Sequence, residues 1–213
     1  STDESIMSLV RNANKETMEE NSNKNAVLVS TQRDLIAGEC SKDLADRVML
    51  PERIVKAHYD GVLHFHDKDY YIQPMFNCCL VNLHDMLQNG TVVNGKMITK
   101  PHSFRTACTI ATQIIAQVAS GQFGGQTITL THLAPFVRDS KEFIRQKVIT
   151  EFKKIGVVVT DEQIEIIVTD RLQQEIKDGI QTFQYQINTL QTSNGQAPFL
   201  SVFMCVKENP EYE

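Results

Sequence analysis

The apolar periodicity of residues 103–120 constrains the fold more than any other feature of the chain. Its apolar side chains recur at the three- and four-residue spacing that places them on one face of an α-helix; they are Phe104, Ala107, Ala111, Ile114, Ile115 and Val118. Ser103, Ala107 and Ala111 are small, so this face would permit a second helix to approach closely. That helix could belong to an ordinary core, or it could be the same helix of a second copy in a two-fold interface.

The first 61 residues also predict mostly helix. Residues 1–30 predict a polar helix followed by a solvated turn, and residues 31–48 predict a helix that is broken at Gly38. Pro51 suits the first turn of a further helix, and Gly61 stands where that helix is expected to end.

Two more helices and two strands are expected later in the chain. A charged helix covers about residues 138–155, and Thr160 with Gln163 forms a capping-box pattern that opens the longest helix, at 161–190. Residues 62–66 (VLHFH) predict a short strand, and residues 199–206 (FLSVFMCV) predict a buried one. The fold class is therefore α/β and rich in helix.

The composition narrows the class of protein. A net charge of −5 over 213 residues gives no basic footprint for a nucleic-acid polymer. The sequence has no apolar run of 18 residues and shows no signal peptide, so we expect no membrane span and a cytoplasmic location. The cysteines are odd in number and form no CxxC pair, which favours neither a disulfide framework nor a zinc site; they are Cys40, Cys78, Cys79, Cys108 and Cys205.

The first motif with chemical potential is His64-Phe65-His66-Asp67. On a strand, His64 and His66 would point to the same side. They could bind a metal, donate hydrogen bonds to a polar substrate, or lie in the core or at an edge beside carboxylates. A third metal ligand is not evident, so no metal site is assigned.

The second motif is Asn77-Cys78-Cys79-Leu80. On an extended segment the adjacent cysteines would point to opposite faces, so that one enters a pocket while the other packs. Both could also be small buried hydrophobes. No strongly cationic side chain is close in sequence, so the pattern alone does not support a stable thiolate.

Two further segments are rich in turn residues. Residues 121–126 (GQFGGQ) lack the spacing of a P-loop and of a dinucleotide-binding fingerprint, so their glycines are expected only to allow a tight backbone path. Residues 194–199 (NGQAPF) predict a turn that leads into a strand.

Six segments together, in this order, resemble class III anaerobic ribonucleoside-triphosphate reductases, which are glycyl radical enzymes. They span about residues 10–206 and read TQRDLIAG, KAHYDGVLHFHDKDYY, NCCLVNLHDMLQNG, QIIAQVASGQFGG, LAPFV and FQYQINTLQTSNGQAPF. The resemblance implies reduction of ribonucleoside triphosphates to deoxyribonucleoside triphosphates by thiyl-radical chemistry, with formate commonly supplying the reducing equivalents.

The resemblance also gives individual residues a role. Cys78 is implied to be the catalytic cysteine, with His64, His66 and Asn77 near the substrate. Thr99, His102 and Gln113 are implied to contact a dNTP effector, on a dimer helix at about residues 101–121. Thr99 and His102 differ from the acidic and basic residues that the family pattern has at those two positions.

The implied fold is part of a ten-stranded α/β barrel of the pyruvate formate-lyase type. Residues 1–60 would form an N-terminal helical segment, and residues 61–213 the first part of the barrel. The family's glycyl-radical motif, four-cysteine zinc site, second active-site cysteine and ATP-cone are not found in the sequence. We therefore expect an N-terminal portion that carries no cofactor and is inactive alone.

The implied partners are ribonucleoside triphosphates, dNTP and ATP effectors, a second copy of the chain, and a separate activating enzyme that uses S-adenosylmethionine and an iron–sulfur cluster. Two alternatives stay open. The chain could be a dNTP-binding and dimerisation module without activity of its own, or it could belong to another glycyl radical enzyme, such as formate acetyltransferase.

Overall fold

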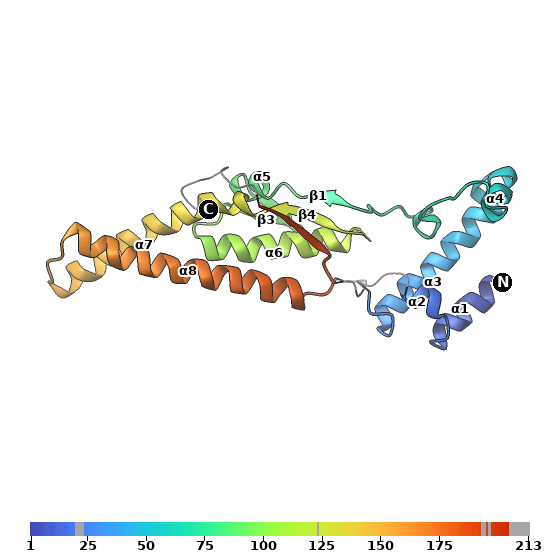
Figure 1. Cartoon of the computed structure of the whole chain (residues 1–213), viewed down its shortest axis with the longest axis horizontal. Coiled ribbons are helices and arrows are strands. Elements are labelled where there is room, and N and C mark those ends of the chain that lie inside the picture. The colour runs from blue at the N-terminus through green and yellow to red at the C-terminus, as the bar shows by residue number, and fades with distance from the viewer. Residues whose placement is uncertain (20–23, 123, 193–194, 196, 205–213) are drawn as a thin grey trace. The chain divides into compact units, whose positions relative to one another are not determined.

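The computed structural model describes residues 1–19, 24–122, 124–192, 195 and 197–204 (Figure 1). The chain divides into two compact units. The first consists of residues 1–77, 120–124 and 191–197, and the second of residues 78–119, 125–190 and 198–213. The predicted boundary at residue 60 differs from the end of the first unit at Asn77, because the segment after residue 60 packs on an N-terminal helix.

That helix, α3 (Val29–Leu44), is the centre of the first unit. It follows α1 (Thr2–Val10) and α2 (Lys15–Glu19), and it continues into the π-helical turn η1 (Ala45–Met49) before α4 (Glu52–Tyr59). Both α1 and the 3₁₀ turn η2 (Lys68–Tyr70) pack on α3. Pro51 directly precedes α4, and Gly61 follows its end with a φ of 73°, in agreement with the prediction.

The prediction of a helix broken at Gly38 is wrong, because α3 runs through this residue without interruption. A glycine inside a helix costs about 1 kcal/mol relative to alanine. Here the absence of a side chain serves packing, since a Cβ at Gly38 would lie 3.2 Å from the Cβ of Asp69. The glycine therefore lets the η2 segment lie close against α3.

The strand predicted at residues 62–66 is also wrong. The amides of Val62 and Leu63 donate to the carbonyl of Ala57, at 2.9 and 3.2 Å, instead of to a neighbouring strand. The Phe65 amide donates to Nδ1 of His58 at 3.2 Å. The end of α4 thus satisfies these donors and turns the segment into a loop.

The second unit contains a three-stranded sheet of order β1-β4-β5, in which both pairs are parallel. Its strands are β1 (Cys79–Leu80), β4 (Gln126–Thr129) and β5 (Leu200–Phe203). After β1 come α5 (Leu83–Gln88) and the antiparallel hairpin β2 (Thr91–Val93) and β3 (Lys96–Ile98). Asn94 and Gly95 form the turn with φ values of 50° and 75°, so the Asn-Gly pair was a hairpin signal that the sequence analysis did not use.

Three long helices complete the second unit, as Figure 1 shows. They are α6 (Phe104–Ser120), α7 (Ala134–Ile155) and α8 (Asp161–Thr189). The capping box at Thr160 and Gln163 agrees with the prediction. Helix α7 ends at Ile155, as predicted, and the left-handed Gly156 follows it. Helix α7 begins earlier than the predicted residue 138, with Pro135 in its first turn, a position that proline favours.

The apolar face of α6 lies in the core of this unit. Ala107 and Ala111 are fully buried within the chain itself. Gly179 of α8 packs against this helix, since a Cβ there would lie 2.8 Å from two ring carbons of Phe104. Ala107 and Ala111 are thus enclosed within this chain, and they give no support to a two-fold interface through this face.

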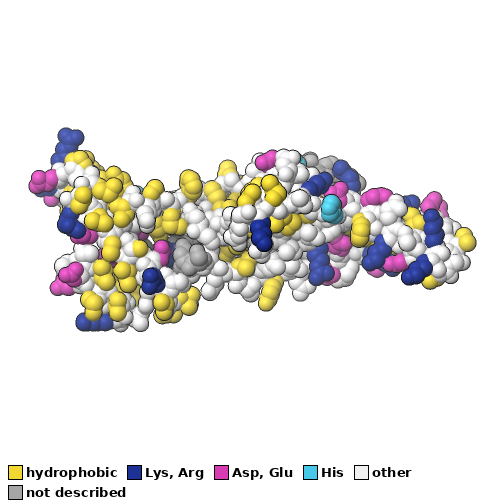
Figure 2. Space-filling model, turned by 180° about the vertical axis from the view of Figure 1, so that it is seen from behind, with side chains coloured by type: hydrophobic (Ala, Val, Ile, Leu, Met, Phe, Trp, Pro, Cys, Tyr) yellow, Lys and Arg dark blue, Asp and Glu magenta, His cyan; other side chains and the backbone are white. Residues whose placement is uncertain are grey.

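Strand β5 forms where a strand was predicted, but it is not buried in this chain. Val202 is 44% exposed and Phe203 is 58% exposed, because within the described residues β5 has a strand beside it on one side only. The predicted residues 205 and 206 lie outside the described part. Hydrophobic side chains are visible elsewhere on the surface as well (Figure 2). Among the described residues, no helix has the length and apolar character needed to cross a bilayer.

We predict that Gly179→Ala destabilises the second unit by about 1–3 kcal/mol, because the new methyl group overpacks against the buried Phe104 ring. Alanine in a helix interior would otherwise stabilise by roughly 1 kcal/mol. Urea unfolding measures the change. Gln181→Ala, at an exposed position of the same helix, is the control and should change stability by less than about 0.5 kcal/mol. A more stable Gly179→Ala variant would contradict this packing.

Candidate functional site

A polar cavity of about 470 Å³ lies in the first unit. Its walls come from α2, α3, α4 and the loop that carries His64 and His66, and they include three histidines and three lysines. The left-handed residue Asp67 also lines it, with φ 55° and ψ 37°. Non-glycine residues rarely adopt this conformation, and residues that do so are concentrated at functional sites.

The three histidines form a row along this cavity. The ring centroids of His58 and His64 are 5.6 Å apart, and those of His64 and His66 are also 5.6 Å apart. Nδ1 of His58 accepts the Phe65 amide hydrogen, so the proton of neutral His58 resides on Nε2. Nδ1 of His66 lies 2.7 Å from Oδ1 of Asp67. Among the described residues, no three His, Cys, Asp or Glu side chains are placed to hold a metal ion.

The lysines of the cavity are each paired with a carboxylate. Lys24 donates to Asp34 at 2.5 Å and to the Tyr70 hydroxyl at 2.8 Å. Burial lowers the pKa of Lys24, but these hydrogen bonds outweigh it, so the pKa lies above its ordinary value. Lys42 lies 3.1 Å from Glu39, and Lys68 lies 2.9 Å from Asp46. The cavity is thus polar, but its ammonium charges are compensated.

The cysteine pair lies where the first unit ends and the second begins. Cys79 starts β1 and is half-buried against the core, whereas Cys78 is exposed. Burial raises the pKa of the Cys79 thiol, and the nearby Cys78 adds to this. Cys79 therefore packs, as expected of one of the two cysteines. That Cys78 enters a pocket stays a prediction.

Two glycines hold the residues on either side of Cys78. The Gly124 amide donates to the Asn77 carbonyl at 2.8 Å, and the Cys79 amide donates to the Gly125 carbonyl at 3.3 Å. A Cβ at Gly124 would lie 2.1 Å from Oδ1 of Asn77, and one at Gly125 would lie 2.5 Å from Cδ1 of Phe199. The backbone of the glycine segment follows a tight path, as expected. The absence of side chains allows it to lie in close contact with Asn77 and Phe199.

Thr99, His102 and Gln113 all belong to the second unit, and all three are exposed. Thr99 and His102 lie between β3 and α6. Gln113 lies nine residues after the start of α6; at the rise of an α-helix, this is roughly 14 Å along the axis. The three residues are therefore exposed, but they do not all lie at the same end of α6.

The amino end of α6, next to His102, is capped from other helices. Oγ of Ser140 on α7 accepts the Phe104 amide hydrogen at 2.7 Å and donates to Glu175 of α8 at 2.6 Å. Glu175 also accepts the Arg105 amide hydrogen at 3.5 Å. The first amides of α6 are therefore already satisfied by groups of the same chain.

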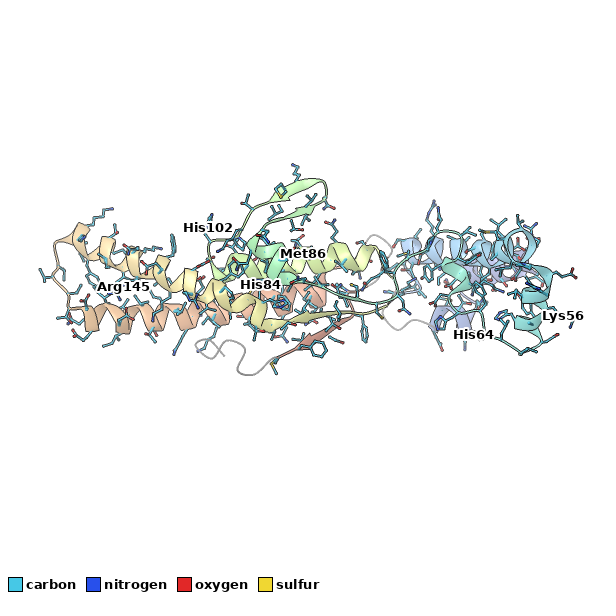
Figure 3. The ribbon with its side chains drawn as sticks, turned by 90° about the horizontal axis from the view of Figure 1, so that it is seen from above. Lys56, His64, His84, Met86, His102 and Arg145 are labelled. Carbon is cyan, nitrogen blue, oxygen red and sulfur yellow. The ribbon has the colours of Figure 1, made fainter. Side chains whose placement is uncertain are left out.

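The predicted site residues fall into separate groups. His64, His66 and Asn77 belong to the first unit, whereas Cys78 and the effector candidates belong to the second; Figure 3 labels His64 and His102. Sequence reasoning missed His58, Lys68 and Phe199, because their roles come from contacts distant in sequence. Phe123, Asn194, Gln196 and Cys205, named in the sequence motifs, lie outside the described residues.

Comparisons with known proteins point to one family. A family model described as anaerobic ribonucleoside-triphosphate reductase matches residues 20–213. The chain is 40% identical over 199 residues to the anaerobic ribonucleoside-triphosphate reductase of Haemophilus influenzae. It is 38% identical over 200 residues to that of Enterobacteria phage T4. Each match covers 92% of this chain but only 27% and 32% of those proteins, respectively.

A solved structure shares the fold. It is the crystal structure of the anaerobic ribonucleotide reductase from Thermotoga maritima in complex with dATP and CTP. The likeness has a TM-score of 0.57 at 14% identity, and it covers 94% of this chain and 34% of that one. The helix-rich α/β arrangement is therefore that of an anaerobic ribonucleotide reductase.

We predict that Gly125→Ala destabilises the second unit and that Phe199→Ala partly restores its stability, because the added methyl group would collide with the Phe199 ring. A double-mutant cycle by urea unfolding should give a coupling energy of at least about 0.5 kcal/mol. Phe203→Ala, at an exposed residue of β5, should not rescue Gly125→Ala. Additive effects of Gly125→Ala and Phe199→Ala would refute the contact.

We also predict different reactivity for two thiols of the 213-residue chain. Cys108 is fully buried, and burial raises its pKa to about 12, so it stays protonated at pH 8. Cys78 is exposed. Iodoacetamide should alkylate Cys78 at least about tenfold faster than Cys108, as measured by peptide mass spectrometry. Equal rates under native conditions would mean that Cys108 is accessible.

Proposed function

The chain belongs to the anaerobic ribonucleoside-triphosphate reductase family, and from this premise we propose that it forms part of the catalytic chain of such a reductase. The complete protein reduces ribonucleoside triphosphates to deoxyribonucleoside triphosphates. The observation that carries the proposal is the family match over residues 20–213, which includes the Asn77-Cys78-Cys79 segment. The same match favours this reading over formate acetyltransferase.

Cys78 is the proposed catalytic residue, because its exposed thiol stands between two residues that glycines hold in place. A glycyl radical, expected elsewhere in the complete protein, supplies the unpaired electron. Cys78 gives up its sulfur-bound hydrogen atom and, as a thiyl, takes the C3′ hydrogen of the ribonucleotide. The 2′-hydroxyl takes up a proton from solvent and leaves as water. A two-electron donor such as formate supplies two electrons and a second proton as it becomes carbon dioxide, and Cys78 returns the hydrogen atom to C3′.

A thiyl does not require a depressed pKa. It requires a dry site and a fixed geometry toward the C3′ hydrogen. In this chain the glycine contacts on Asn77 and Cys79 supply part of the fixed geometry, while the thiol itself is exposed. Exclusion of water is therefore proposed to depend on parts of the complete protein beyond these 213 residues.

His64, His66 and Asn77 are the proposed substrate-binding residues. The support is the cavity that His64 and His66 line and the contact between Asn77 and Gly124. Because the cavity lysines are paired with carboxylates, the histidines are proposed to form hydrogen bonds with hydroxyl groups of the substrate.

Thr99, His102 and Gln113 are proposed to contact a dNTP effector in a homodimer. Their exposure supports this role. Since the small residues of α6 lie in the core of the same chain, a two-fold contact would use the exposed polar face of α6 instead. A chain that acts only as a binding and dimerisation module would show the same exposure, and the activity test below separates the two.

The proposed fold of the complete protein is a ten-stranded α/β barrel, to which the parallel β1-β4-β5 sheet would contribute. The glycyl radical and a four-cysteine zinc site are proposed to lie outside this chain. A separate activating enzyme, which uses S-adenosylmethionine and an iron–sulfur cluster, would generate the radical, and ATP would serve as a further effector.

The test is Cys78→Ser in a complete reductase chain that carries this sequence. We expect deoxyribonucleotide formation to be abolished, because a serine hydroxyl does not replace the thiyl, while the glycyl radical signal in EPR stays intact. Cys40→Ser, at an exposed cysteine of α3, is the control and should retain turnover. Normal turnover of the Cys78→Ser variant would exclude Cys78 as the radical-bearing residue.

A further inference from the structure

Lys68 is a buried cation on the wall of the cavity that holds His64 and His66. It is only 6% exposed, although lysine is rarely buried without a partner. A lysine beside a nucleotide site would ordinarily be assigned to a phosphate. The contacts of Lys68 point to a different role.

The Lys68 ammonium is already engaged by two side chains of the same unit. The nitrogen lies 2.9 Å from each carboxylate oxygen of Asp46 and 3.2 Å from the hydroxyl of Tyr59. That hydroxyl donates in turn to Asp46 at 2.6 Å, which closes a three-membered network. The Asp46 carboxylate compensates the ammonium charge, and only 7% of the Lys68 side chain is exposed, so a phosphate would have to compete with this network.

The network attaches the carboxyl-terminal end of the histidine loop, residues 64–68, to α4. Lys68 directly follows Asp67 and contacts Tyr59, while at the near end the Phe65 amide is bound by His58. His58 and Tyr59 are adjacent residues at the end of α4. The segment from residue 64 to residue 68 is therefore held at both ends by one turn of one helix.

Three features of the backbone lie at or next to this attachment. Asp67, between His66 and Lys68, has a φ of 55°, and such a conformation persists only where the surrounding structure enforces it. The Lys68 carbonyl accepts a hydrogen bond from Ser41 on α3 at 3.1 Å. Asp46 belongs to the π-helical turn η1, a type of turn that often marks functional sites.

We infer that Lys68, together with Asp46 and Tyr59, is a positioning group that sets the orientation of His64 and His66, and that it does not bind phosphate. The orienting role stands on the geometry of this chain alone. Its consequence for catalysis rests on the proposed function, in which the two histidines bind the substrate.

The direct test is NMR of the histidine imidazoles in the 213-residue chain. Lys68→Met removes the ammonium and keeps the aliphatic stem, and Tyr59→Phe removes only a hydroxyl from an exposed ring. Both should shift or broaden the ¹⁵N and ¹H signals of His64 and His66. Lys68→Arg, which retains the charge, should shift them less.

The matched control is Lys56→Met. Lys56 lies on α4 and pairs with Asp60 at the surface, with 72% of its side chain exposed (Figure 3). This variant should leave the imidazole signals unchanged. Tyr59→Phe keeps the test decisive if Lys68→Met fails to fold. Unchanged His64 and His66 signals in a folded Tyr59→Phe or Lys68→Met variant would overturn the inference.

Kinetics of the complete reductase separate the two roles of Lys68. A positioning group should lower kcat by roughly tenfold to a hundredfold in Lys68→Met, with partial rescue by Lys68→Arg. A phosphate ligand would instead raise KM and leave kcat unchanged, which would overturn the inference. If Lys68→Met moves the imidazole signals while His64→Ala leaves turnover normal, the positioning role stands and the proposed substrate role of His64 fails.

Discussion

The surroundings of Cys78 depend on one constraint, which is the close contact of the Gly124 and Gly125 backbone with the residues on either side of this cysteine. Each glycine binds one neighbour of this cysteine through the main chain, Gly124 to Asn77 and Gly125 to Cys79. A side chain at either position would lie within 2.5 Å of Asn77 or Phe199. These main-chain contacts hold the residues on either side of Cys78.

The buried face of α6 forms a large part of the core of the second unit. Its apolar face is enclosed by helices and strands of one chain, which leaves the polar face toward solvent. Thr112 is buried and bonds Gln186 of α8, so even a polar side chain of this helix has an internal partner. Gln113 lies on the exposed side of this helix, whereas Thr99 and His102 precede its first residue.

Much of the fold could be predicted from sequence where the signal is local. The period of α6 and the capping box at Thr160 each depend on residues that are close in sequence, and both predictions agree with the structure. The predictions at Gly38 and at residues 62–66 failed because both depend on partners distant in sequence, Asp69 in one case and the end of α4 in the other. The candidate role of Cys78 came from resemblance to a family, because no local pattern indicates it. The roles of Lys68 and His58 could be inferred only from their contacts in the structure.

The shared cap at the amino end of α6 has a mechanical consequence. Ser140 and Glu175 belong to α7 and α8, yet they satisfy the first amides of α6. If α8 slid along its axis by one turn, about 5.4 Å, the Arg105 amide would lose its acceptor and the Ser140 hydroxyl would lose the carboxylate to which it donates. A displacement of α8 relative to α6 therefore carries the cost of two unsatisfied hydrogen-bond donors next to His102, one from the backbone and one from a side chain.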